Sequence, residues 1–265
     1  MSDLPAPRPA LDPVRLAGLP APLRVEVLPA TPSTNAVVAA RAREGEPAGL
    51  VVVTEHQTAG RGRLDRVWET PPRVALTFSV LLRPQVEPAD WTWLPLLAGY
   101  AVHAGLADRL PEVALKWPND VLVEDRKIAG ILVERVETPD GPAAVVGVGL
   151  NVNQDLADLP SANATSLRLE LGETFDRTDL LVQVLGSLRA LEPLLLHTDQ
   201  LRTAYCDVCS TLGREVDVHL PGGEVTRGEA LDLDAHGALV VSTGTGALTV
   251  NAGDVIHVRP TTEME

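Results

Sequence analysis

The sequence predicts an α+β protein in which a larger domain of helices and strands precedes a small domain of short strands. Its 265 residues suit such a pair, and 45% of them are hydrophobic, which is enough for a packed core. Apolar runs rich in β-branched residues alternate with longer segments of helical periodicity as far as residue 210. Beyond it, short alternating runs are separated by glycine-containing turns, which is typical of a small barrel.

The first 24 residues are predicted to form an extended or disordered lead-in. Eight prolines fall within the first 32 positions, and proline both fixes φ and removes a hydrogen-bond donor. The first folded elements are a strand over 25–28, a helix over 36–44 capped by Ser33 or Thr34, and a strand over 50–54.

The larger domain is expected to span 25–210 and the small domain 211–265. Residues 56–67 are rich in glycine and arginine and are predicted to form a loop. The small domain has five or six brief strands. The other predicted elements are strands over 74–82, 113–117, 121–124, 128–136 and 143–150, and helices over 93–110, 178–197 and from there to about 210.

The chain is strongly acidic, with a formal net charge of −14 and a pI near 4.8. Such a surface repels phosphate backbones and anionic lipids, so we expect no nucleic-acid or membrane partner. No apolar run approaches the ~20 residues that span a bilayer. The N-terminus lacks a long apolar segment, which indicates a cytoplasmic protein.

Two cysteines, Cys206 and Cys209, form a lone C-x-x-C motif. A zinc site would need a second pair of ligands nearby, and a thioredoxin-type site would need a βαβ context. We therefore expect buried thiols rather than a redox or metal centre, and no metal-ligating side chains are predicted.

Lysine occurs at only two positions, Lys116 and Lys127, among 22 basic residues. An ammonium group on a thin stem reaches into a narrow pocket that a guanidinium does not enter, although codon bias is an alternative explanation. Antiparallel pairing of the surrounding strands would bring both lysines to one end of a pocket. Ala129 and Gly130 would leave room there for a ligand.

A glycine- and arginine-rich loop is the second candidate site. Gly60 and Gly62 allow close approach of the backbone to a ligand, and Arg61, Arg63 and Arg66 supply donors for a phosphate or carboxylate. The loop lacks the third glycine of a dinucleotide fingerprint, and no Gly-Lys pair exists, which excludes a P-loop. It is either an anion site or a solvated basic turn.

Asn151 lies where the apolar strand over 147–153 reaches a polar end. It either contacts a sugar hydroxyl or an adenine edge, or it caps a turn.

Four motifs follow one another in a specific order: GRGRLDRVW, LKWPNDV, KIAGILVE and GVGLNVN. They closely resemble the biotin protein ligase family, from about residue 25 into the C-terminal domain. The resemblance implies a mixed sheet with helices related to class II aminoacyl-tRNA synthetases, followed by an SH3-like barrel. It also implies an ATP-dependent ligase, with Mg²⁺, that forms biotinyl-5′-AMP and transfers biotin to a lysine. The acceptor would be a biotin carboxyl carrier domain of an acyl-CoA or pyruvate carboxylase.

The resemblance also implies roles for individual residues. Asp65 departs from the family, which commonly has glycine there, and its charge weakens the loop's field or pairs with Arg63 or Arg66. The catalytic residues would be Lys127, Arg61, Arg63 and Asp120. The residues that bind biotin would be Ser33, Thr34, Asn35, Gln57, Gly60, Arg61, Gly62, Arg63 and Lys127. The residues that bind ATP would be Arg63, Arg66, Trp68, Asn119, Asp120, Lys127, Asn151 and Arg259.

Three other functions remain as alternatives. A lipoate ligase or octanoyltransferase has a related fold, but the KWPND and GRGR motifs and the small domain favour biotin. A biotin-responsive repressor needs a helix-turn-helix that 32 proline-rich residues do not accommodate. A non-catalytic biotin-binding module would need no cationic sites, so the two cationic sites of this chain argue against it. The sequence leaves both monomer and homodimer open.

Overall fold

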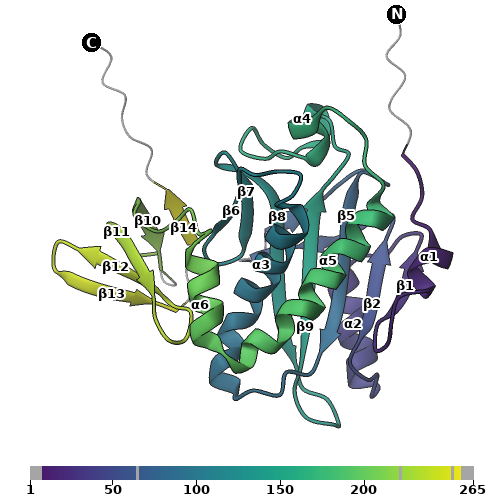
Figure 1. Cartoon of the computed structure of the whole chain (residues 1–265), viewed down its shortest axis with the longest axis horizontal. Coiled ribbons are helices and arrows are strands. Elements are labelled where there is room, and N and C mark those ends of the chain that lie inside the picture. Colours follow the sequence, from purple (N-terminus) through teal and green to yellow (C-terminus); the bar gives the residue numbers. More distant parts are fainter. Residues whose placement is uncertain (1–7, 64–65, 221–222, 252–253, 258–265) are drawn as a thin grey trace, which may run out of the picture.

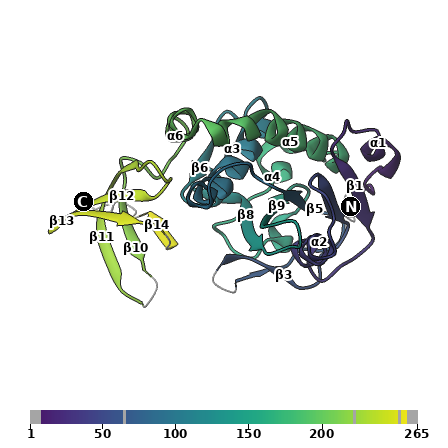
Figure 2. The same cartoon turned by 90° about the horizontal axis from the view of Figure 1, so that it is seen from below.

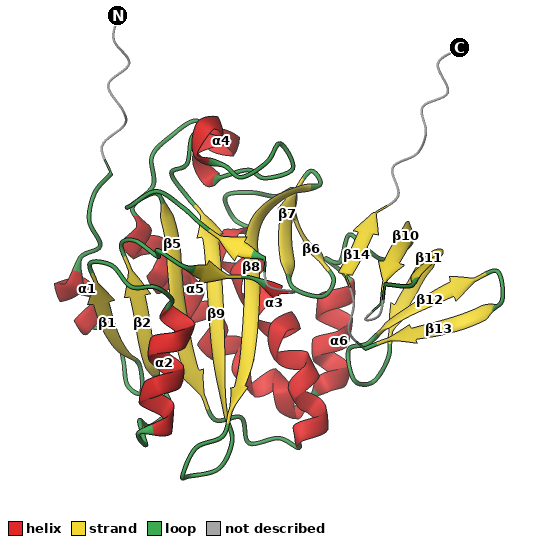
Figure 3. Ribbon diagram, turned by 180° about the vertical axis from the view of Figure 1, so that it is seen from behind, coloured by secondary structure: helices red, strands yellow, loops and turns green. Residues whose placement is uncertain are grey.

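A computed structural model describes residues 8–63, 66–220, 223–251 and 254–257 of the protein. A large mixed sheet forms its centre, and a separate small sheet lies at one side (Figure 1). Helix α2 (Thr34–Arg43) covers one face of the large sheet, while α3 (Leu94–Leu106) and α5 (Arg177–Leu191) cover the other (Figures 2 and 3). This arrangement confirms the predicted α+β class.

The large sheet has seven strands in the order β1-β2-β5-β9-β8-β7-β6. The β1–β2 pair is parallel and the other neighbours are antiparallel, so the sheet is mixed. Strands β2, β5 and β9 are buried along their whole length, which explains their continuous apolar runs. The strands are β1 (Arg24–Leu28), β2 (Leu50–Thr54), β5 (Ala75–Leu82), β6 (Val113–Lys116), β7 (Asp120–Val123), β8 (Arg126–Val136) and β9 (Ala143–Asn151).

The predicted helices are all present, but three of them end several residues earlier than predicted: α3 at Leu106, α5 at Leu191 and α6 at Cys206. Ser33 caps α2, because its side chain accepts from the Ala36 amide. Of the two predicted caps, Ser33 and Thr34, the first is confirmed. The predicted helix over 178–197 ends at Leu191, because Pro193 lacks the amide proton that would continue it. The remaining helices are α1 (Pro13–Ala17), α4 (Leu167–Leu171), α6 (Thr198–Cys206) and the 3₁₀ turns η2 (Pro88–Trp93), η3 (Leu156–Asp158) and η4 (Glu192–Leu196).

A β-bulge interrupts the pairing of β7 with β8. Val121 pairs with Ala129, but the next residue, Leu122, pairs with Lys127, so position 128 is left over. The extra residue reverses the alternation of side chains along β8. Lys127 and Gly130, which would face opposite sides of a regular strand, therefore lie on the same side of the sheet.

The lead-in over 1–24 was predicted to be extended or disordered, and for Pro13–Ala17 this is wrong. Helix α1 forms there, capped by Asp12. The fully buried guanidinium of Arg177 donates to the Pro9 carbonyl (2.9 Å) and pairs with Glu55 at 2.5 Å. Proline spacing does not reveal this anchoring, because the partner lies on α5.

The small sheet has five antiparallel strands in the order β13-β12-β11-β10-β14. It packs against the larger domain through two tryptophans: the indole of Trp93 donates to Ala235 O (3.0 Å) and that of Trp117 to Gly237 O (2.9 Å). In the part of the chain described, no helix is long and apolar enough to cross a bilayer. The strands are β10 (Glu215–His219), β11 (Val225–Leu233), β12 (Leu239–Thr243), β13 (Gly246–Val250) and β14 (Asp254–His257).

Candidate active site

Two adjoining compartments lie over the middle of the large sheet. The smaller has a volume of about 270 Å³ and the larger about 710 Å³. Five residues line both compartments and therefore lie at the boundary between the two. The shared residues are Val67, Trp68, Asp120, Lys127 and Pro160.

Glycines make the floor of the smaller compartment. Gly130 on β8 pairs with Gly149 on β9, so two positions without side chains lie next to each other. A Cβ at Gly149 would be 2.5 Å from the Trp68 ring, and one at Gly130 would be 2.9 Å from Lys127 Nζ. The glycines thus allow Trp68 and Lys127 to lie directly on the sheet.

Buried polar side chains close one end of the smaller compartment. Gln57 Oε1 accepts from the Thr34 amide at 3.0 Å. Ser79 Oγ lies 2.7 Å from Thr34 Oγ1 and 2.6 Å from Asn35 Oδ1. All four side chains are buried, and Ser33 lines the same wall. This end offers both hydrogen-bond donors and acceptors to a small polar ring.

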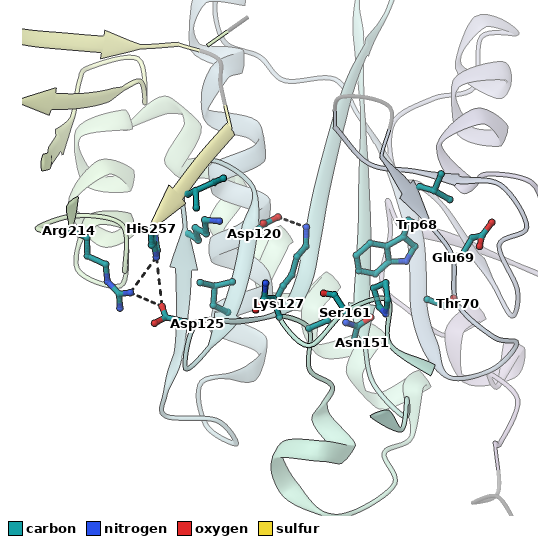
Figure 4. Close-up of a pocket in the computed structure, with 17 residues that line it drawn as sticks. Trp68, Glu69, Thr70, Asp120, Asp125, Lys127, Asn151, Ser161, Arg214 and His257 are labelled. Carbon is teal, nitrogen blue, oxygen red and sulfur yellow. Dashed lines mark hydrogen bonds and ion pairs between the residues drawn. The ribbon is translucent and has the colours of Figure 1, made fainter. Parts of the chain in front are cut away.

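Lys127 lies at the boundary of the compartments. Its Nζ is 2.6 Å from Asp120 Oδ1 and 5.8 Å from the centre of the Trp68 ring (Figure 4). The backbone of Lys127 is held from the other side, because its amide donates to Asn163 O and its carbonyl accepts from Thr165. The cation therefore has a fixed position facing both spaces.

The glycine- and arginine-rich segment forms the cover of the smaller compartment. It includes the short paired strands β3 (Gly60–Arg61) and β4 (Val67–Trp68). Arg63 Nη1 donates to Asn119 Oδ1 at 3.1 Å, and Asn119 Nδ2 donates to Ile131 O, which ties the segment to the turn before β7. Gly62 and Arg66 line the same compartment.

The larger compartment extends to the small domain. Lys116 lines it together with Lys127, as predicted from their antiparallel hairpin. From the other side come Arg214, which donates to Asp125 Oδ1 at 2.7 Å, and His257 (Figure 4). Burial, and then the nearby charges of Lys116 and Arg214, lower the pKa of His257 to about 4. At neutral pH the histidine is therefore uncharged, and the positive groups of this wall are Lys116 and Arg214, the latter paired with Asp125.

All the predicted site residues within the described ranges line one of the compartments except Gly60, whose Cβ position lies against Gln57 and Trp68. Asn151 lines the larger compartment. Its side chain also holds a turn, because Nδ2 donates to Thr165 O and Oδ1 accepts from Gln154 Nε2. Arg259 and Asp65 lie outside the described residues. Reasoning from sequence missed Ser79, Arg214 and His257, which no local motif marks. It also assigned no role to Glu134, although this residue ends the KIAGILVE motif.

The cysteine and metal predictions concern groups outside the two compartments. Burial raises the pKa of the Cys206 thiol to about 11 and also raises that of Cys209, which is inert behaviour for both thiols. Among the residues described, no group of three or more His, Cys, Asp or Glu side chains could hold a metal ion.

Comparison with known families matches both parts of the chain. Residues 27–151 match the biotin/lipoate A/B protein ligase family, and residues 211–258 match the biotin protein ligase C terminal domain.

Individual relatives match over most of their length. The biotin–[acetyl-CoA-carboxylase] ligase of Mycobacterium tuberculosis is 40% identical over 247 residues, which cover 89% of this chain and 90% of the relative. The bifunctional ligase/repressor BirA of Bacillus subtilis is 30% identical, over 84% of this chain and 70% of the relative. A structure of the Aquifex aeolicus biotin protein ligase in complex with biotin and ATP has a TM-score of 0.73 at 28% identity and covers 89% of this chain and 98% of that one.

Proposed function

The chain belongs to the biotin protein ligase family, and from this premise we propose how its two compartments carry out the reaction. The protein is an ATP-dependent ligase that activates biotin as biotinyl-5′-AMP and transfers it to a lysine of a carboxylase. We propose that the smaller compartment holds biotin, that the larger holds ATP, and that Lys127 stands where the reacting groups meet.

The smaller compartment fits biotin in shape and polarity. Asn35, Gln57 and Thr34 provide hydrogen-bonding groups for a cyclic urea at the closed end, and Ser79 lies behind them, bonded to Thr34 and Asn35. The Trp68 ring and the apolar side chains of Phe78, Ile131 and Val148 line the space for the rest of the bicycle. The carboxylate at the end of the aliphatic tail would then reach towards Lys127.

The larger compartment fits a nucleotide because cations border it on three sides. Lys127, Lys116 and Arg214 come from β8, β6 and the start of the small domain. Attack of a carboxylate on the α-phosphate pushes two anions together, and fixed cations in a site shielded from water lower that barrier by several kcal/mol. Arg61 and Arg63, on the covering segment, would add to this charge.

We propose Mg²⁺ as the companion of the nucleotide. The larger compartment contains Asp120 and Asp125, and Mg²⁺ usually binds one or two carboxylates together with substrate phosphates. Its chemical contribution is to neutralise phosphate charge.

The second half-reaction would use the same boundary. An acceptor lysine attacks the biotinyl carbonyl and AMP leaves, with Asp120 positioned to orient or deprotonate that amine. The acyl phosphate is sensitive to water, so we propose that the arginine-rich segment excludes solvent until the acceptor arrives. The acceptor would be a biotin carboxyl carrier domain of an acyl-CoA or pyruvate carboxylase, in the cytoplasm.

The observation that carries this proposal is the boundary position of Lys127, which borders both compartments. The test is incubation of the protein with ATP, Mg²⁺, biotin and a carrier domain, followed by mass spectrometry of the carrier. We expect an adduct of biotin mass on one lysine, and no adduct when lipoate replaces biotin. A carrier that stays unmodified, or takes lipoate equally well, contradicts the proposal.

A further inference from the structure

Asn35 uses the donors of its amide away from the smaller compartment. Its Nδ2 lies 2.6 Å from Glu134 Oε2 and 3.3 Å from Leu132 O. A carboxylate and a carbonyl can only accept hydrogen bonds, so the atom of Asn35 that faces them must be the nitrogen. Both amide protons are therefore engaged.

The oxygen of the same amide has one position left. Asn35 Oδ1 lies 2.6 Å from Ser79 Oγ, and an amide oxygen has two lone pairs. It also lies over Gly147, where a Cβ would come within 2.2 Å of it. What Asn35 presents to a ligand is thus a hydrogen-bond acceptor.

We propose that Glu134 is a positioning residue that holds Asn35 as an acceptor and so selects a ligand whose ring carries N–H donors. The inference rests on the proposed function, since it assumes that the ring of biotin occupies this end. A cyclic urea supplies two N–H groups, whereas the dithiolane of lipoate and a plain acyl chain supply none. A site built to accept a hydrogen bond from a ligand N–H discriminates against ligands that lack this group.

Glu134 acts from outside the compartment. It lies on β8, its side chain is 33% exposed, and its second oxygen is 3.5 Å from Arg61 Nη2. The pair with Arg61 gives it a possible second effect, on the covering segment. Substitutions that keep or remove the acceptor separate the two effects.

The test measures binding of biotin and of lipoate by calorimetry, together with KM and kcat for biotin. Glu134→Met keeps the length of the side chain and removes the acceptor, so the Asn35 amide is free to turn. We expect its Kd and KM for biotin to rise about tenfold or more, with lipoate binding no weaker than in the wild type. The KM for ATP should change less than about twofold, since Lys116, Lys127 and Arg214 keep their places in the larger compartment.

Three comparisons decide the outcome. Glu134→Gln still offers an oxygen to Asn35 and should bind biotin within about threefold of the wild type. Glu137→Ala is the matched control, because Glu137 follows the same strand but pairs with Arg135 instead. In an Asn35→Ala background, Glu134→Met should no longer change biotin binding.

Two results overturn the inference while leaving the proposed function intact. The first is a Glu134→Met protein that binds biotin as tightly as the Glu137→Ala control. The second is a Glu134→Gln protein as weak as Glu134→Met, which would assign the effect to the ion pair with Arg61. A wild-type protein that binds no biotin overturns the proposed function itself.

Discussion

Lys127 and Asp120 form an ion pair, Nζ to Oδ1 2.6 Å, across two neighbouring strands of the large sheet. The bulge in β8 makes the pair possible, because it turns Lys127 to the face on which Asp120 lies. The pair stands at the boundary of both compartments and marks the point at which the substrates are expected to react.

Replacing Lys127 by arginine should abolish most of the adenylation activity. The planar guanidinium is wider than an ammonium, and Gly130 leaves room only for the thin end of lysine. We expect pyrophosphate release with biotin and ATP to fall about 10²-fold or more. A rate close to that of the wild type would contradict the role assigned to Lys127.

Replacing Arg61 by alanine should increase the loss of biotinyl-AMP into solution. Arg61 belongs to the covering segment and is tied to the sheet through Glu134. Without this tie the cover opens more readily and water enters. The measurement is the rate at which labelled adenylate leaves the protein, with Arg227→Ala in the small domain as a control. Equal rates for the two variants would remove Arg61 from this role.

Adding a methyl group at Gly149 should displace Trp68. The new Cβ would lie 2.5 Å from the ring, so the indole must move off the sheet. We expect kcat/KM to fall about tenfold to 10²-fold, since a shift of about 1 Å near the reacting groups has effects of this size. Gly186→Ala on α5 is the control, because its Cβ meets nothing within 4 Å; an equal loss of activity there would show a general folding defect.

Removing the charge of Arg177 should destabilise the fold. The guanidinium is 1% exposed and its partner Glu55 would remain as a buried carboxylate without a counterion. Arg177→Met is expected to lower the free energy of unfolding by about 3–5 kcal/mol in urea titrations. The exposed Arg15 on α1 pairs with Asp179 on α5, the helix that carries Arg177. Arg15→Ala should therefore change the free energy of unfolding little. A stable Arg177→Met protein would show that the lead-in is held by other contacts.

Stability should decrease as the pH falls from about 6.5 to about 4. Burial and the charges of Lys116 and Arg214 lower the pKa of His257 to about 4, while Asp125 opposes them. A histidine with a lowered pKa stabilises the fold above its unfolded pKa, and this contribution disappears as protons bind the unfolded chain first. For this shift of about 2.5 pKa units the loss is at most about 3.5 kcal/mol, at 1.4 kcal/mol for each unit.

The matching variant for this pH effect is His257→Gln, studied by denaturant titration at several pH values. The wild type should lose more stability than the variant between pH 6.5 and 4, because only the wild type has the titrating ring. Parallel curves for the two proteins would contradict the assignment.

The sequence predicted the strands of the large sheet to within one or two residues, because each buried run is rich in β-branched residues. It also predicted that Lys116 and Lys127 share a pocket, since two tight turns fold β6, β7 and β8 into consecutive antiparallel strands. The bulge could not be predicted, because a left-over residue at position 128 depends on the register with β7.

The missed residues have a common physical reason. Ser79 lies within the apolar strand β5. No neighbouring residue in the sequence shows that its hydroxyl bonds to Thr34 and Asn35 rather than to its own backbone. Arg214 and His257 reach the site only because the small domain packs beside β6, about 100 residues earlier in the chain than Arg214. Contacts of this range depend on tertiary packing, which single motifs do not record.

The indoles of Trp93 and Trp117 hydrogen-bond the larger domain to the small one. The backbone amide of Trp117 adds a third hydrogen bond between the domains by donating to Thr211 Oγ1 at 3.0 Å. Heat should consequently melt the whole chain in one calorimetric peak rather than two. A truncated version ending near residue 210 would leave two aromatic faces bare and should precipitate, so its inactivity would say nothing about chemistry in the missing part.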